Sequence, residues 1–347
     1  MQQEISDNIK FTALRDQLPE MILNKLSEAN VFFSEEYYNY TQARHEKIYY
    51  LWDNRYILSI RVKKVFIFRS GLLDSEPFSL TSDNFLNYEK AFMNRCCEYI
   101  KKNNLLDWIQ SEISANFLVY PNKAVVYGAG NYILDIENHT EEELFEKLHS
   151  KNRNMVRRGQ REGVTVLRKG DNLIHDYKQV EDQVWARNKQ APRSMEYYNK
   201  ISEYMPNTSS CAVAYKDDIP EAGAIFLYTK AMGYYHHGAS KTKPTPGAHN
   251  YLIWDEILYL KSLGVRKICF VGYRREKEAC LNSKALGIQK FKERFGGDVL
   301  LTYSFKYEFN RTKYKLYRIA NWIINKEKIK DCYDSRKDNY PEYNVAL

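Results

Sequence analysis

Three histidines are the first residues whose types could do chemistry. His236 and His237 are adjacent in the chain, and His249 follows twelve positions later. Imidazole is a common metal ligand and general base. Neighbouring residues of a strand point to opposite faces, so the adjacent pair is not expected to reach one site, and no carboxylate follows at ligand spacing. We therefore predict structural histidines with satisfied hydrogen bonds, and no metal site.

Two of these histidines end a run of four polar aromatic residues, 234–237, within an expected strand at 233–240. Strict alternation predicts that Tyr235 and His237 share one face, while Tyr234 and His236 share the other. Four such side chains in a row indicate that one face lines a cleft rather than a dry core.

Arg193 and Tyr197 have a spacing of four residues. On a helix they would lie one turn apart and face the same way. The forked donors of arginine suit phosphate or carboxylate groups. A surface arginine packed on a tyrosine is the alternative, and the spacing does not decide between them.

Basic residues are unevenly distributed along the 347 residues, whose net charge is +8. The windows 151–169, 241–294 and 305–330 are strongly basic, and the rest of the chain is acidic in sum. Such clustering is expected for a polyanionic partner such as RNA, a nucleotide or a phospholipid. Solvated helix faces are the alternative.

Composition limits the class of protein. Apolar residues make up 44% and charged residues 28%, which is typical of globular chains and excludes collagen-like or wholly disordered ones. No stretch has the length and apolarity of a membrane span, and no secretory signal is visible, so we expect a cytoplasmic protein. The six cysteines form no C-x-x-C pair, which favours reduced thiols over zinc or disulfides.

The length predicts about two domains. In the first, we expect helical structure over the first ~30 residues, a β-hairpin, a helix, a strand pair, and a helix opened by a Thr140–Glu143 capping box. The corresponding ranges are 47–53 with 56–68, 84–103, 116–120 with 124–136, and 141–161. We place the first domain at 1–143 plus 306–347 and the second at 144–305.

The second domain has a recognisable order of elements. We expect strands at 164–168, 210–216, 222–229, 231–240, 267–272 and 298–309, and helices at 174–189, 249–263 and 312–329, with Gly264 ending the middle one. Helix, helix, antiparallel meander, crossover helix and parallel strand is the order of an N-acetyltransferase-like (GNAT) fold. The predicted class is α/β, with two GNAT-like domains in tandem and mixed central sheets flanked by helices.

Two segments carry a family resemblance. The first is 148–166, which contains Met155-Val-Arg-Arg-Gly159. The second runs from Gly238-Ala-Ser240 through Phe270-Val-Gly272 to Gly287-Ile-Gln-Lys-Phe-Lys-Glu-Arg-Phe-Gly-Gly297. Together they resemble the Fem family of peptidoglycan-bridge peptidyltransferases, tandem GNAT-like proteins that transfer amino acids from aminoacyl-tRNA to a peptidoglycan precursor. The resemblance covers about 148–303, and Phe-Lys-x-x-Phe-Gly-Gly is its most specific element.

The resemblance implies roles for a few residues. Lys292, preceded by Phe291, matches the lysine at the family's reaction centre, where an ammonium would stabilise the oxyanion of acyl transfer. Arg193 and Tyr197 match the spacing that holds the acceptor's phosphates, and Tyr235 is the tyrosine expected to line the acceptor pocket. An ordinary surface lysine is the alternative for Lys292.

The chain also departs from the family pattern. The region 32–38 has no match to the Trp/Lys element by which some members grip the acceptor. The interval between Tyr197 and Ser210 leaves no room for the coiled-coil arm of larger members. The chain therefore resembles the compact members.

The turn at 240–249 bears on the donor. Acyl-CoA-dependent GNAT enzymes hold pyrophosphate on backbone amides of a Gly-rich turn, whereas this turn has one glycine and two prolines, which have no N–H. CoA is therefore disfavoured. Lys241, Lys243 and Arg157 would instead offer phosphate contacts to a tRNA acceptor stem.

The leading hypothesis is an aminoacyltransferase that needs no cofactor and forms an amide bond from aminoacyl-tRNA to an amine of a nucleotide- or lipid-linked envelope precursor. One alternative is an acyltransferase that uses a CoA or carrier-protein thioester and modifies a glycan or amino sugar. Another is a GNAT-like binding module without catalytic activity. We expect a monomer.

Overall fold

The computed structural model describes residues 8–26, 28–82, 85–168, 173–273 and 283–325. The chain divides into two compact units: unit 1 consists of Met1–Ser27, Thr41–Gly130 and Leu301–Leu347, and unit 2 of Glu28–Tyr40 and Asn131–Leu300. The predicted domains, 1–143 with 306–347 and 144–305, stay a prediction, because compactness alone does not show which part folds by itself. Cys280, Cys332 and the predicted end of the last helix lie outside the described residues.

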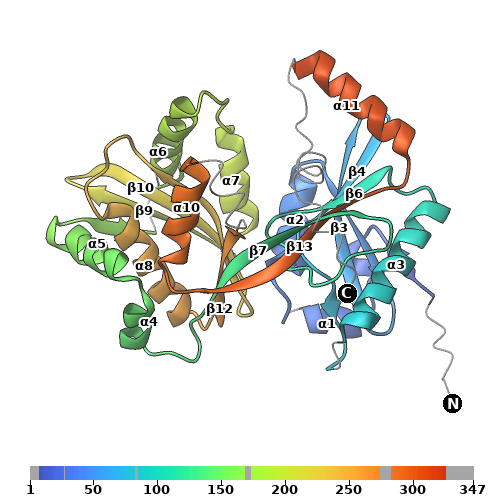
Figure 1. Cartoon of the computed structure of the whole chain (residues 1–347), viewed down its shortest axis with the longest axis horizontal. Coiled ribbons are helices and arrows are strands. Elements are labelled where there is room, and N and C mark those ends of the chain that lie inside the picture. The colour runs from blue at the N-terminus through green and yellow to red at the C-terminus, as the bar shows by residue number, and fades with distance from the viewer. Residues whose placement is uncertain (1–7, 27, 83–84, 169–172, 274–282, 326–347) are drawn as a thin grey trace. The chain divides into compact units, whose positions relative to one another are not determined.

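Unit 1 contains a mixed array of strands (Figure 1). In spatial order these are β1 (Lys10–Thr12), β2 (Lys47–Trp52), β3 (Tyr56–Val65), β4 (Phe68–Leu73), β6 (Trp108–Ser111) and β13 (Asp298–Glu308, of which 301–308 belong to this unit), with β5 (Phe78–Ser79) beside β3. β4 and β6 are parallel, and their crossover carries α3 (Leu86–Lys102). Phe92, Cys96 and Ile100 of this helix are buried in the same core as Leu58 and Ile60 of β3.

Unit 2 has the predicted meander. Its strands in spatial order are β7 (Val125–Asp135, of which 131–135 belong to this unit), β12 (Lys267–Tyr273), β11 (Gly233–Ser240), β10 (Ile219–Tyr228), β9 (Ser209–Lys216) and β8 (Thr165–Leu167). β8 to β11 pair antiparallel, and β12 pairs parallel to β11 after the crossover helix α8 (Ala248–Ser262). This confirms the predicted sequence of meander, crossover helix and parallel strand.

Helices cover both faces of the meander. Gly223 approaches Tyr177 of α6 (Leu173–Arg187), whereas the next residue, Ala224, packs in the core that contains Leu252 of α8. Successive strand residues face opposite ways, so α6 and α8 lie on opposite faces. The other helices of the described residues are η1 (Arg15–Gln17), α1 (Glu20–Leu26), η2 (Val31–Phe33), α2 (Glu35–Ala43), α4 (Glu141–Lys147), α5 (Ser150–Arg161), α7 (Met195–Tyr204), α10 (Ser283–Glu293) and α11 (Arg311–Asn325).

Local signals in the sequence fix several element ends. The capping box at α4 is confirmed: Thr140 accepts from the backbone of Glu143, whose carboxylate accepts from the backbone of Thr140. Gly264 follows the end of α8 with φ of +78°, as a helix-terminating glycine requires.

Some predicted elements are wrong. The single helix expected at 141–161 is two helices, because His149 accepts a hydrogen bond from the backbone of Lys151 and starts α5 anew. No strand forms at the predicted 116–120, a described segment, where the backbone of Phe117 only accepts from Tyr303. Helical structure was expected over the first ~30 residues; in their described part, 8–26 and 28–30, it is limited to η1 and α1, and Lys10–Thr12 form strand β1. Within the described residues, no helix has the length and apolarity to cross a membrane.

Candidate functional site

A β-bulge in strand β11 sets the orientation of the candidate residues. The register between β10 and β11 shifts so that Phe226 pairs with Tyr235 and Ile225 with His237. His236 is the extra residue, and the strand changes phase there. The predicted sharing of a face by Tyr235 and His237 is therefore wrong.

On the α8 face, Tyr235, His249 and Ser240 form a hydrogen-bonded chain. The Tyr235 hydroxyl lies 3.1 Å from His249 Nε2, and Ser240 Oγ lies 2.7 Å from His249 Nδ1. Gly238 makes room for this arrangement, because a Cβ there would lie 1.7 Å from the Tyr235 hydroxyl oxygen. The bulge is what brings Tyr235, Gly238 and Ser240 to one face.

Lys292 and Phe291 meet this chain from α10. Lys292 Nζ lies 5.8 Å from the ring centroid of Tyr235 and donates to the backbone carbonyl of Val271. The Phe291 ring centroid lies 5.0 Å from that of His249. Lys292 is partly buried, so its ammonium is held against the protein.

Burial determines the protonation of the hydrogen-bonded chain. It lowers the pKa of His249 to about 4, so the imidazole is neutral at pH 7. It raises the pKa of the Tyr235 hydroxyl well above its ordinary value. In a neutral imidazole one nitrogen donates and the other accepts, so the chain can run in either direction between Tyr235 and Ser240.

These residues border a place where two strands stop pairing. β11 and β12, both fully described, pair only at Gly233–Ile268 and Tyr234–Cys269, although they continue to Ser240 and Tyr273. We call the segments 235–240 and 270–273, which do not pair with each other, the strand opening. Tyr235 lies on one of these segments, and the carbonyl that Lys292 contacts lies on the other.

A second cluster lies on the opposite face of β11. The Tyr197 hydroxyl lies 3.0 Å from Nε2 of His237 and 3.4 Å from Nε2 of His236. The expectation that two adjacent histidines cannot reach one site is therefore wrong, because the bulge directs both toward Tyr197. Burial, followed by the charges of His236 and Arg193, lowers the pKa of His237.

Arg193 contributes to this cluster from outside a helix. It precedes Ser194, the N-cap of α7, so the predicted placement of Arg193 and Tyr197 on one helix is wrong. The two still touch, with the guanidinium 5.6 Å from the Tyr197 ring centroid. Arg193 also pairs with Glu181 at 3.1 Å, and Glu181 accepts from the Tyr198 hydroxyl.

The three residues predicted to bind donor phosphates differ in their surroundings: Lys241 is ion-paired, whereas Lys243 and Arg157 are exposed. Lys241 forms an ion pair with the buried Glu221, whose other oxygen accepts from the backbone of Thr245 at 2.6 Å. Lys243 is exposed, and Arg157 is exposed on α5 with its guanidinium 5.2 Å from the Phe145 ring. The Glu221 carboxylate thus binds both the backbone N–H of Thr245 and the side chain of Lys241 in the turn before α8.

The turn before α8 packs tightly on α5. Gly247 has φ of +92°, and a Cβ there would lie 2.2 Å from the Met155 carbonyl oxygen. Within the described part of the chain, no group of three or more His, Cys, Asp or Glu residues is arranged to hold a metal ion.

Sequence reasoning named Tyr235 and His249 separately and missed the link between them. A glycine three residues after an aromatic residue in a strand was the available signal, since it leaves space for a ring lying along the strand. Glu221 and Glu181 carried no signal, because their partners, Lys241 and Arg193, come from other parts of the chain.

Residues 127–218 match the sequence model of the FemAB family. This confirms the predicted resemblance, and the matched range includes Arg157, Arg193 and Tyr197. No curated protein matches the sequence.

Solved structures share the fold of this chain at low sequence identity. The crystal structure of FemX superposes with a TM-score of 0.65 at 12% identity, over 88% of this chain and 99% of that one. A conserved protein of unknown function from Bacteroides thetaiotaomicron gives 0.54 at 11% identity, over 86% and 99%. The C-terminal domain of a putative lysylphosphatidylglycerol synthetase from Agrobacterium fabrum gives 0.51 at 12%, over 76% and 85%. The predicted fold class, α/β with GNAT-like domains in tandem and mixed sheets, is confirmed.

Proposed function

We propose that this protein is a FemAB-like aminoacyltransferase that forms an amide bond from an aminoacyl-tRNA to an amine of a cell-wall or envelope precursor. The observation that carries the proposal is the position of Lys292. Its ammonium lies beside Tyr235 and contacts the backbone of β12 at the strand opening. An aminoacyl-tRNA donor requires a cytoplasmic reaction.

The chemistry assigned to Lys292 is stabilisation of charge. The acceptor amine attacks the ester carbonyl, the new C–N bond forms, and negative charge develops on the carbonyl oxygen. Lys292 stabilises that charge, after which the C–O bond breaks and the ribose hydroxyl leaves with the proton lost by the amine. A substrate carboxylate or water carries this proton.

Tyr235 and His249 support the same step. Where His249 Nε2–H donates to the Tyr235 oxygen, the Tyr235 hydroxyl proton is available to the reacting oxygen. Phe291 packs on His249 and holds the imidazole in place. We assign Tyr235 to contact with the reacting groups and with the acceptor. We assign Phe291 to the positioning of His249.

The turn before α8 favours tRNA over CoA as the donor. The backbone N–H of Thr245 is taken up by Glu221, a negative group that would repel a pyrophosphate there. Lys243 and Arg157 remain exposed for phosphates of an acceptor stem. Such contacts would be independent of sequence and weakened by salt.

The Arg193–Tyr197 cluster is assigned to phosphates of the acceptor. Arg193 is partly exposed and shares Glu181 with Tyr198, so it is oriented before a ligand arrives. An Arg193→Lys variant keeps the positive charge but loses the paired N–H donors of the guanidinium group. The assignment predicts that this variant has a raised KM for the acceptor with little change in kcat. An unchanged KM would contradict the assignment of Arg193 to acceptor phosphates.

The experiment that tests the function is label transfer. The purified protein is incubated with labelled aminoacyl-tRNA or labelled acyl-CoA and with envelope extract, and the label in envelope precursors is measured. Transfer from aminoacyl-tRNA supports the proposal, and transfer from CoA alone would replace the donor. Absence of transfer from either donor would favour a binding module.

A further inference from the structure

We propose that α11 and the basic pocket beside it form a docking surface for a bilayer that contains anionic phospholipids. This surface belongs to unit 1 and is separate from the residues assigned to acyl transfer. The proposal does not depend on the activity proposed above.

The helix presents an apolar side to solvent. Leu316, Ile319, Trp322, Ile323 and Ile324 are all exposed, Trp322 by 53% and Ile323 by 64%. We call Leu316, Ile319, Trp322 and Ile323, which lie within about 120° of one another around the helix axis, the α11 face. The apolar side of an amphipathic helix ordinarily faces the protein core.

The side of α11 that packs on the protein is aromatic. Tyr314 is buried, with its ring 5.1 Å from Trp108, and Tyr317 packs on Phe68 at 5.5 Å. Because these contacts anchor the helix, its aliphatic side is left outward. The β3–β4 turn just before Phe68 adds two more exposed apolar residues, Phe66 and Ile67.

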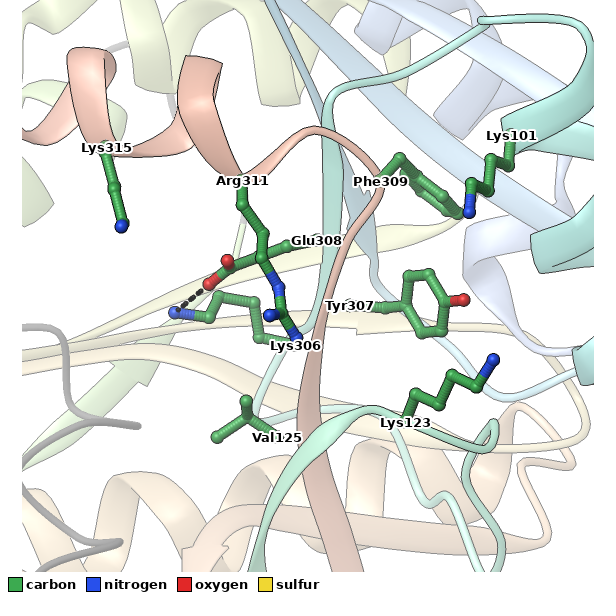
Figure 2. Close-up of a pocket in the computed structure, with 9 residues that line it drawn as sticks. All are labelled: Lys101, Lys123, Val125, Lys306, Tyr307, Glu308, Phe309, Arg311 and Lys315. Atoms are coloured by element: carbon green, nitrogen blue, oxygen red, sulfur yellow. Dashed lines mark ion pairs between the residues drawn. The ribbon is translucent and has the colours of Figure 1, made fainter.

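A basic pocket adjoins the start of the helix. Its cavity of about 570 Å³ is lined by five cations and one carboxylate, together with Val125, Tyr307 and Phe309. Figure 2 shows Lys101 and Lys123 on the side of Tyr307 and Phe309, with Arg311, Lys306 and Lys315 around Glu308. Lys306 is buried and pairs with Glu308 at 3.1 Å, which leaves the lining strongly positive.

The combination of the α11 face with the pocket favours a membrane. Interfacial helices bury an apolar face at the headgroup boundary while basic side chains meet anionic lipids. RNA would use the cations but would gain nothing from exposed isoleucines. A second copy of the chain would bring two sets of cations together, which is unfavourable.

The test is co-sedimentation of the full chain with vesicles of phosphatidylcholine alone or mixed with phosphatidylglycerol. We expect binding to the mixed vesicles that weakens as salt is raised. A Trp322→Ser/Ile323→Ser variant should bind about tenfold more weakly, since burial of each side chain contributes a favourable transfer free energy. A Lys101→Gln/Lys123→Gln/Lys315→Gln variant should bind about a hundredfold more weakly, since each charge near the surface contributes about fivefold.

Matched controls lie in unit 2. Ile219→Ser removes a comparably exposed isoleucine, and Lys230→Gln/Lys267→Gln removes two exposed lysines. Both should bind vesicles as the wild type does. Hydrogen exchange of 311–325 gives a measurement on the unmodified protein, and vesicles should slow it.

Several outcomes would overturn the proposal. One is that the wild type does not bind vesicles. Another is that the Trp322→Ser/Ile323→Ser variant binds as tightly as the wild type. A third is that vesicles do not change the hydrogen exchange of 311–325. Binding of RNA in place of vesicles would do the same, as would a concentration-dependent dimer that the Trp322→Ser/Ile323→Ser variant abolishes.

Discussion

Lys292 Nζ lies 5.8 Å from the ring centroid of Tyr235 and donates to the carbonyl of Val271, at the strand opening between β11 and β12. A charged donor is thus held next to a tyrosine whose hydroxyl bonds a neutral imidazole. Fixed donors of this kind stabilise developing charge without reorganising during the reaction.

The space left by Gly238 gives the first prediction. A methyl group in Gly238→Ala would lie 1.7 Å from the Tyr235 hydroxyl oxygen and 2.5 Å from Cζ, so the ring must leave His249. We expect a loss of about 1–3 kcal/mol in the free energy of unfolding from overpacking, together with reduced transfer activity. Urea denaturation and the transfer assay measure the two effects.

Gly287→Ala is the matched control, because a Cβ at this helical position meets nothing within 4 Å. It should stabilise α10 by up to about 1 kcal/mol. Equal behaviour of the two alanine variants would contradict the proposed role of Gly238.

Acid sensitivity follows from His249. Its pKa of about 4 in the folded state is below its unfolded value, so between these values the unfolded chain binds the extra proton and stability falls as the pH is lowered from about 6.5 to 4. In His249→Gln, the decrease in the free energy of unfolding on acidification should be smaller than in the wild type by up to about 3 kcal/mol. Unfolding free energies of both proteins at pH 7 and 4.5 provide the check, and an unchanged difference would refute it.

The opposite sign is expected at Glu89 of α3. Burial, with a smaller contribution from Glu76, raises the pKa of Glu89 to about 7, and its Oε1 has no partner among the described residues. The folded state therefore holds a proton that the unfolded state releases, and stability falls as the pH rises from about 4.5 to 7. The free energy of unfolding of Glu89→Gln, measured relative to the wild type, should therefore be up to about 3 kcal/mol more favourable at pH 8 than at pH 5.

Glu98→Gln is the control on the same helix, since Glu98 is exposed. Its effect on unfolding should be small at both pH values. If Glu89→Gln behaves like Glu98→Gln, Glu89 is ionised in the folded protein at neutral pH and the prediction fails.

Local chemistry made part of the fold predictable. The Thr140–Glu143 box and Gly264 mark helix ends through bonds and torsions of neighbouring residues, and both were placed correctly. The break at His149 was missed because a histidine cap competes with an otherwise continuous helical pattern.

The candidate site was less predictable because it depends on a register shift. Alternation gives the faces of a strand only while the phase is constant, and the bulge at His236 reverses it for the residues that follow. Tyr235 and Lys292 were named from motif positions, but their closeness arises from strands and helices distant in the chain. Arg193 was placed on a helix that begins two residues later.

The most direct test of the central claim compares Lys292→Met with Lys290→Met in the label-transfer assay. Lys290 lies on the same helix and is exposed, so it controls for loss of a lysine from α10. We predict that Lys292→Met lowers kcat at least about a hundredfold, as removal of an oxyanion-stabilising donor does, while Lys290→Met stays near wild type. Wild-type turnover by Lys292→Met on the same substrates would contradict the assignment of Lys292.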